Sequence, residues 1–182
     1  MAIYYPGDSC QNAVPEHLCN PCLAIELAGV RSVAFVADNF TFTNPSSTSE
    51  WANGVASDDI ILIPETNGTF DGGAPQEGAG FGDNPTSLDG YDFTLNYFDP
   101  NFIGNTDFYD TIKNSRNSWK VVFRTGSQIF ISDKTVTILP KMPVAADVKG
   151  KVLWDVTVKW TSQNLPVGYN TPSNVFRCVQ TL

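Results

Sequence analysis

The sequence contains one histidine, no long apolar run and, in its first 112 residues, a single basic side chain. A Ser-His-Asp or Cys-His catalytic arrangement would depend on His17, and nothing around that residue resembles a nucleophile elbow. No apolar run approaches the roughly 18–20 residues that a membrane helix requires, which predicts a soluble protein with no membrane partner. The N-terminal sequence has neither a basic region nor an apolar core, so we expect no signal peptide.

The basic residues are concentrated in the C-terminal part of the chain. Residues 1–112 contain sixteen Asp and Glu and one basic residue, Arg31, giving −15, whereas residues 113–182 contain ten Lys and Arg and three Asp, giving +7. Two interpretations are open: these charges neutralise each other within one domain, or surfaces of opposite sign meet between copies in head-to-tail association. The sequence has no dense basic stripe of the kind that binds nucleic-acid phosphates.

The length of 182 residues and the hydrophobic content of 42% predict one domain with a full core. We divide the chain into an irregular cysteine-bearing N-terminal segment (1–29), a core (30–165) and an extended C-terminal arm (166–182). Within the core, the glycine-rich stretch 68–90 predicts a long loop, and loops of that length are usually functional or mobile.

Alternating apolar and polar residues predict β-strands. The clearest pattern lies in residues 151–160, where the apolar residues from Val152 to Trp160 share one parity and Asp155, Thr157 and Lys159 share the other. This alternation is typical of a half-buried antiparallel strand. Further strands are expected at 31–43, 60–63, 91–97, 119–125, 128–132 and 135–139.

Two helices interrupt the predicted strands. Thr106 can cap a helix over about 106–114, with acidic residues early and Lys113 late, as the helix dipole favours. A shorter helix can begin after Ser47 and end at Gly54. The combination predicts an all-β fold, a β-sandwich or β-barrel, with one flanking α-helix.

The four cysteines are candidate metal ligands. Cys19 and Cys22 have the spacing of a zinc knuckle, and Cys10 and Cys178 would complete a tetrahedral thiolate site. Disulfide bonds and reduced cysteines remain alternatives. No two carboxylates stand out as a glycosidase pair, and no lysine or helix follows Gly78–Gly82 to form a phosphate cradle. Apart from a possible structural zinc, we therefore predict no cofactor and no enzyme activity.

Several stretches resemble the tail tube family of tailed bacteriophages, and they are also similar to small virion structural proteins of phages that infect Bacteroidota, including crAss-like phages. The resemblance covers roughly residues 30–165. It is carried by Ile63-Pro-Glu-Thr-Asn-Gly68, Tyr91-Asp-Phe-Thr-Leu-Asn-Tyr97, Asp107-Phe-Tyr-Asp110, Val122-Phe-Arg-Thr-Gly-Ser-Gln128, Val136-Thr-Ile-Leu-Pro140 and the strand from Val152 to Trp160.

The resemblance implies a tail-tube-like sandwich whose copies form rings, usually hexameric, that stack head to tail around a lumen. DNA passes through such a tube without sequence-specific binding, and the partners are other copies and further tail or head–tail proteins. The location implied is the virion, assembled in the cytoplasm of the bacterial host. We expect the lumen or the contact between rings to include part of the acidic set Asp71, Glu77, Asp83, Asp89 and Asp92.

Two other functions fit the sequence. A connector or terminator ring, or a capsid decoration protein, would share the fold but assemble differently. A carbohydrate-binding or hydrolytic β-sandwich would use exposed aromatic side chains as sugar platforms, for which the candidates are Trp51, Tyr91 and Trp119.

Overall fold

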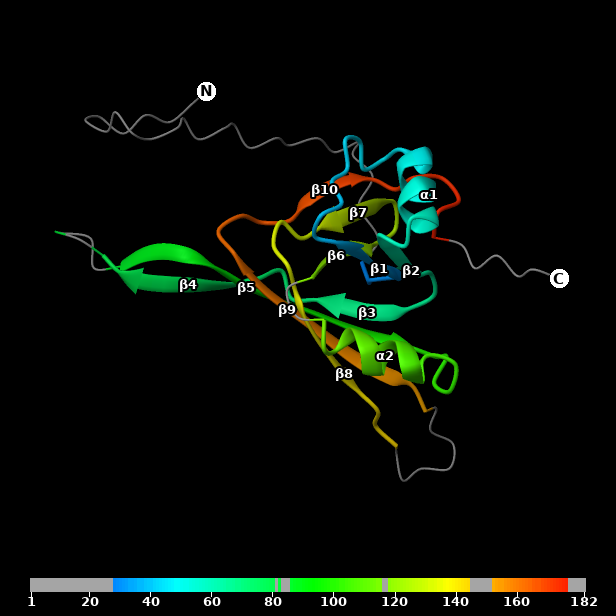
Figure 1. Cartoon of the computed structure of the whole chain (residues 1–182). Coiled ribbons are helices and arrows are strands. Elements are labelled where there is room, and N and C mark those ends of the chain that lie inside the picture. The colour runs from blue at the N-terminus through cyan, green and yellow to red at the C-terminus, as the bar shows by residue number, and fades with distance from the viewer. Residues whose placement is uncertain (1–27, 81, 83–85, 116–117, 145–151, 177–182) are drawn as a thin grey trace.

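The computed structural model describes residues 28–80, 82, 86–115, 118–144 and 152–176. They form two antiparallel β-sheets and two helices (Figure 1), which confirms the all-β fold with a flanking helix. Sheet 1 has the strand order β10 (Val167–Asn170), β7 (Gln128–Ile131), β6 (Trp119–Arg124), β1 (Ser32–Ala37) and β2 (Ile60–Ile63). Sheet 2 has the order β3 (Asn67–Phe70), β5 (Thr86–Asp99), β9 (Trp154–Ser162) and β8 (Thr137–Lys141), and β4 (Ala74–Ala79) pairs with the first part of β5.

The main core lies between the two sheets. Alternate residues of β9, from Trp154 to Trp160, are buried as the sequence pattern predicts, while Asp155, Thr157 and Lys159 lie on the opposite face. The same alternation buries Phe93, Leu95 and Tyr97 of β5. Sheet 1 contributes the other half of this core through Val33, Phe35, Val121 and Phe123.

A second core covers the outer face of sheet 1. Helix α1 (Thr48–Ala56) packs Trp51 against that face, where Ala34, Val36 and Val122 are buried. Sheet 1 is therefore covered on both sides, which explains why β1 is almost continuously apolar. The ring of Trp51 also contacts Phe176, 5.1 Å between centroids.

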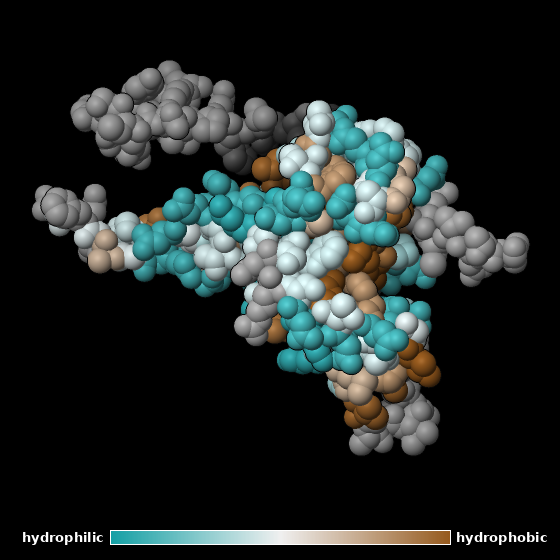
Figure 2. Space-filling view, viewed as in Figure 1, coloured by the Kyte–Doolittle hydropathy of each residue, from teal (hydrophilic) through white to brown (hydrophobic). Residues whose placement is uncertain are grey.

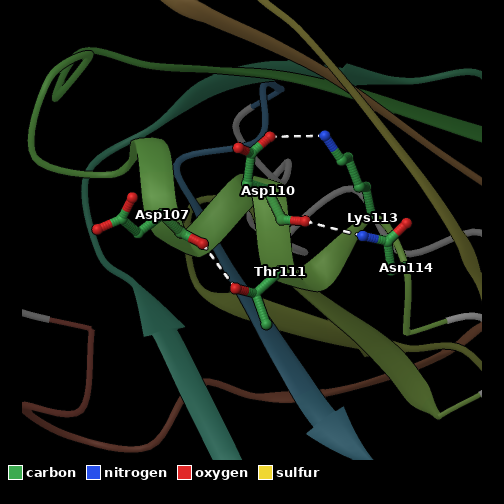
Figure 3. Close-up of polar contacts among 5 residues, drawn as sticks. All are labelled: Asp107, Asp110, Thr111, Lys113 and Asn114. Carbon is green, nitrogen blue, oxygen red and sulfur yellow. Dashed lines mark hydrogen bonds and ion pairs between the residues drawn. The ribbon is translucent and has the colours of Figure 1, made fainter.

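Helix α2 (Thr106–Ile112) closes one end of the main core with Tyr109 and Ile112. Its exposed face is polar (Figure 3): Lys113 forms an ion pair with Asp110 at 2.6 Å, and the hydroxyl of Thr111 donates to the carbonyl of Asp107 at 2.8 Å. This helix lies within the predicted range of about 106–114, but its N-cap is Asn105 rather than Thr106, and the Asn105 side chain makes no capping hydrogen bond.

A buried carboxylate fastens α2 to the end of β5. Asp99 is only 3% exposed. One carboxylate oxygen accepts hydrogen bonds from the hydroxyl of Tyr109 at 2.9 Å and from the side-chain amide of Asn105 at 2.6 Å, and the other accepts from the backbone N–H of Asn101 at 2.9 Å. The loop after β5 is thereby held against the core.

Two of the predicted segments differ from the structure. Most of residues 68–90 is not a loop, because it contains most of β3, all of β4 and the start of β5. Within the predicted arm 166–182, Val167–Asn170 forms strand β10, which pairs with β7 along the edge of sheet 1. In both places the strands are held by pairing with a neighbour and carry little apolar alternation of their own.

Candidate functional site

Strands β4 and β5 form a hairpin that projects from the body of the protein (Figure 1). β5 is 14 residues long, and its pairing with β9 begins only at Tyr91. Of the five residues before Tyr91, four pair with β4 alone and Asp89 has no partner in the register. At about 3.3 Å per residue, the hairpin extends roughly 17 Å past the end of β9. No second layer from the described part of the chain covers it, and Thr86 to Asp89 are all exposed.

The sequence of the hairpin is acidic. Residues 74–92 contain Glu77, Asp83, Asp89 and Asp92 and no basic residue. Every residue of β4 except Gly78 is exposed. Figure 2 shows hydrophilic side chains over much of the hairpin surface that faces the viewer.

A β-bulge decides which carboxylates share a face of the hairpin. Gln76 lies opposite Gly90 but Glu77 lies opposite Leu88, so that Asp89 is the extra residue. A Cβ atom at Gly78 would collide with the carboxylate of Asp89, which places that carboxylate on the face of Gly78. By the alternation of the pairs, Asp89 lies on the outer face with Asp92, and Glu77 and Leu88 share the opposite face, which continues the core face of sheet 2.

Hydrogen bonds hold the carboxylates of Asp71 and Asp92, two members of the predicted acidic set, in place. Asp71 follows β3, and its Oδ1 accepts from the backbone N–H groups of Gly73 and Thr94, both at 3.0 Å. Asp92 accepts from the hydroxyl of Thr161 at 2.7 Å and from the side-chain amide of Gln76 at 2.6 Å. These two hydrogen bonds, aided by the charge of Lys159, lower the pKa of Asp92.

Of the predicted acidic set, Asp71, Glu77, Asp89 and Asp92 are all exposed, on or beside one hairpin. Asp83 lies outside the described residues.

The opposite end of sheet 2 is apolar. The pairing of Asp99 with Trp154 and of Lys141 with Asp155 brings the end of β5, the end of β8 and the start of β9 together. Hydrophobic side chains gather at this end in Figure 2. The exposed residues that flank it are Ile103 (86%), Met142 (53%), Val144 (72%) and Val152 (38%). The chain therefore presents an acidic hairpin at one end of the sheet and exposed apolar residues at the other.

Of the three aromatic residues predicted as sugar platforms, Trp51 is not at the surface. Trp51 is fully buried, and its indole N–H donates to the carbonyl of Pro45 at 2.7 Å, so the prediction of an exposed Trp51 is wrong. Its helix packs it inward because the outer face of sheet 1 is apolar. Tyr91 and Trp119 are half-buried against the main core.

The predicted zinc ligands Cys10, Cys19, Cys22 and Cys178 lie outside the described residues, as do His17 and most of segment 1–29. Across the described ranges, no group of three or more His, Cys, Asp or Glu side chains is arranged to hold a metal ion. Neither α1 nor α2, the two helices in that part of the chain, has the length and hydrophobicity that crossing a bilayer requires.

Comparisons with protein-family models, with curated proteins and with solved structures found no match to this chain. Its function is therefore inferred from its own surfaces.

Proposed function

We propose that this protein is a structural subunit of a virion, forming the stacked rings of a phage tail tube around a lumen that conducts DNA. The observation that carries the proposal is the β4–β5 hairpin, whose two faces have no covering layer among the described residues. A two-stranded ribbon is only marginally stable alone in water. Contacts with another copy would stabilise it, as subunit contacts do in assemblies built from one chain.

The distribution of charge and apolar surface supports the same proposal. A subunit with an acidic hairpin at one end and Ile103, Met142 and Val144 exposed at the other has unlike ends. Unlike ends favour heterologous, head-to-tail contacts, which extend without limit unless the rotation between copies closes a ring.

The proposal assigns a role to the outer face of the hairpin. Asp89 and Asp92 would line the lumen or its rim, with Asp71 beside them. Negative charge there would repel the phosphates of DNA and let it pass without binding. No reaction is part of this role, and the natural location of the protein would be the virion.

Electron microscopy of the purified full-length chain, combined with sedimentation velocity over a wide concentration range, tests the proposal. Open-ended tubes or stacked rings are the expected result. A single closed ring would instead identify a connector or terminator, and binding to intact capsids by a chain that never forms rings would identify a decoration protein. A monomer at every concentration and ionic strength would refute the structural role.

A further inference from the structure

A pocket of about 670 Å³ lies at the end of the molecule away from the hairpin. It opens between the two sheets and has an apolar wall with two arginines beside it. The apolar wall consists of Phe98, Pro100 and Leu153 from the sheet 2 side and Phe176 from the segment after β10. The arginines are Arg31 and Arg124.

Strand pairing forces the two arginines together. The backbone N–H of Arg31 donates to the carbonyl of Arg124 at 2.8 Å, because the chain enters β1 alongside the end of β6. The guanidinium of Arg124 lies 5.8 Å from the ring centre of Phe176, and its Nε donates to the hydroxyl of Ser32 at 3.2 Å. Burial first, and then the charge of Arg31, lower the pKa of Arg124.

Within the described ranges, no carboxylate forms an ion pair with Arg31 or Arg124. Glu65 also lines the pocket, and it too makes no ion pair there, so the described pocket lining carries two positive charges and one negative charge. Two neighbouring cations, one of them partly buried, are costly without an anion to neutralise them. The pocket is therefore suited to a partner surface on which a carboxylate and an apolar side chain lie next to each other.

The hairpin carries this combination on one face. Glu77 and Leu88 lie directly opposite each other in the β4–β5 pairing, and Leu88 is 57% exposed. The hairpin cannot reach its own pocket, because Leu88 and the pocket residue Phe98 belong to the same continuous strand. Ten residues separate them, a distance of roughly 33 Å along a rigid β-strand.

We propose that the Glu77–Leu88 face of one copy docks into the Arg31–Arg124 pocket of the next copy. Leu88 covers the apolar wall, and the carboxylate of Glu77 neutralises the guanidinium pair. The contact is heterologous, so each copy offers one hairpin and one pocket. This inference rests on the proposed structural role and names the surfaces through which successive copies join.

Two charge-reversal variants of the full-length chain test the contact. Glu77→Arg disables the hairpin and Arg31→Glu disables the pocket. Both side chains are exposed, so the cores stay intact. Asp107→Arg and Lys134→Glu make the same charge changes at exposed positions away from both surfaces, and they serve as matched controls. Far-UV circular dichroism and thermal unfolding verify that each variant is folded.

In sedimentation velocity, each interface variant alone should associate at least tenfold more weakly than the wild type, because close charge pairs across interfaces are strongly coupled. The controls should associate as the wild type does. An equimolar mixture of Glu77→Arg and Arg31→Glu retains one intact hairpin and one intact pocket per pair. The mixture should therefore associate more strongly than either variant alone, because this junction is restored and the two reversed charges are themselves opposite in sign.

The docking contact would be overturned if the interface variants associated as strongly as the wild type. It would also be overturned if their mixture associated no more strongly than either variant alone. The structural role would survive that result, provided that the wild type still assembles. A wild-type chain that never associates would overturn both. If the control variants associated as weakly as the interface variants, net charge rather than this contact would govern association, and the contact would be overturned.

Discussion

The buried tyrosine pair at the junction of β5 and α2 should make the fold unstable at alkaline pH. Tyr97 and Tyr109 are both 0% exposed, and their hydroxyl oxygens lie 3.4 Å apart. Burial is the largest cause that raises the pKa of each hydroxyl far above its ordinary value of 10.0, and the nearby charge of Asp99 raises both further. Both tyrosines therefore stay protonated in the folded protein where they would ionise in the unfolded chain.

The sign and the size of the effect follow from proton linkage. Above pH of about 10 the unfolded state loses protons that the folded state keeps, so the free energy of unfolding falls as pH rises. One such tyrosine contributes a slope of about 1.4 kcal/mol per pH unit, and the pair contributes about 2.7. Below pH of about 9 the pair contributes no pH dependence, and its full stabilisation is present.

Replacement of Tyr109 by Phe separates the two contributions. Near neutral pH the variant should lose about 1.5–3 kcal/mol, because it no longer donates a hydrogen bond to the Asp99 carboxylate. Above pH of about 10 its stability should fall less steeply than that of the wild type, by about 1.4 kcal/mol per pH unit, so the two curves converge.

Urea unfolding followed by tryptophan fluorescence at pH 8, 9, 10 and 11 measures both curves. Comparison with the double variant Tyr97→Phe/Tyr109→Phe removes the contribution of all other titrating groups, because these are common to the three proteins. Parallel curves for the three proteins above pH 10 would show that the fold protects neither tyrosine from ionisation, contrary to the expected result.

Three further substitutions have definite expected outcomes. Asp71→Ala should lower the free energy of unfolding by about 1 kcal/mol in urea titrations, because the backbone N–H of Thr94 loses its carboxylate partner; a null effect would mean that water replaces that carboxylate. Gly68→Ala should cost about 1–3 kcal/mol, because the added methyl group collides with the carbonyl of Asn96 on β5; unchanged stability would show that β3 can shift. Trp51→Ala should cost about 3–5 kcal/mol in thermal or chemical unfolding, and selective loss of glycan binding in a stable variant would instead support a sugar-binding role.

The strands that alternate in sequence could be predicted, because burial of one face leaves a direct periodic trace. In β9 the residues from Trp154 to Trp160 alternate with Asp155 and Lys159, and β5 shows the same pattern from Tyr91 onward. Helix α2 was also predictable, because two apolar residues fall on one face, although its N-cap is Asn105 and not Thr106.

The hairpin and its neighbours could not be predicted in the same way. β4 has the sequence Ala-Pro-Gln-Glu-Gly-Ala, which contains Gly and Pro and no apolar alternation, because no described element covers either of its faces. Strands of that kind depend on pairing with a partner, here the early part of β5, and pairing leaves little trace in one sequence. β10 escaped prediction for the same reason, since all four of its residues are exposed.

The candidate site was only partly visible in the sequence. The acidic character of residues 74–92 can be read from composition. However, Glu77 and Asp89 lie on opposite faces of the hairpin because of a bulge that no local sequence signal marks. Arg31 and Arg124 are far apart in sequence, and only the pairing of β1 with β6 brings them together. Trp51 was mistaken for a surface residue because its short helix carries few apolar residues.

A cryo-electron microscopy reconstruction of the assembled full-length protein would show which surfaces join successive subunits. It should show the β4–β5 hairpin of each subunit seated against the Arg31 end of the next, repeated along an open-ended stack. Subunits that meet only through other surfaces, with every hairpin free in solvent, would show that the hairpin does not join the copies.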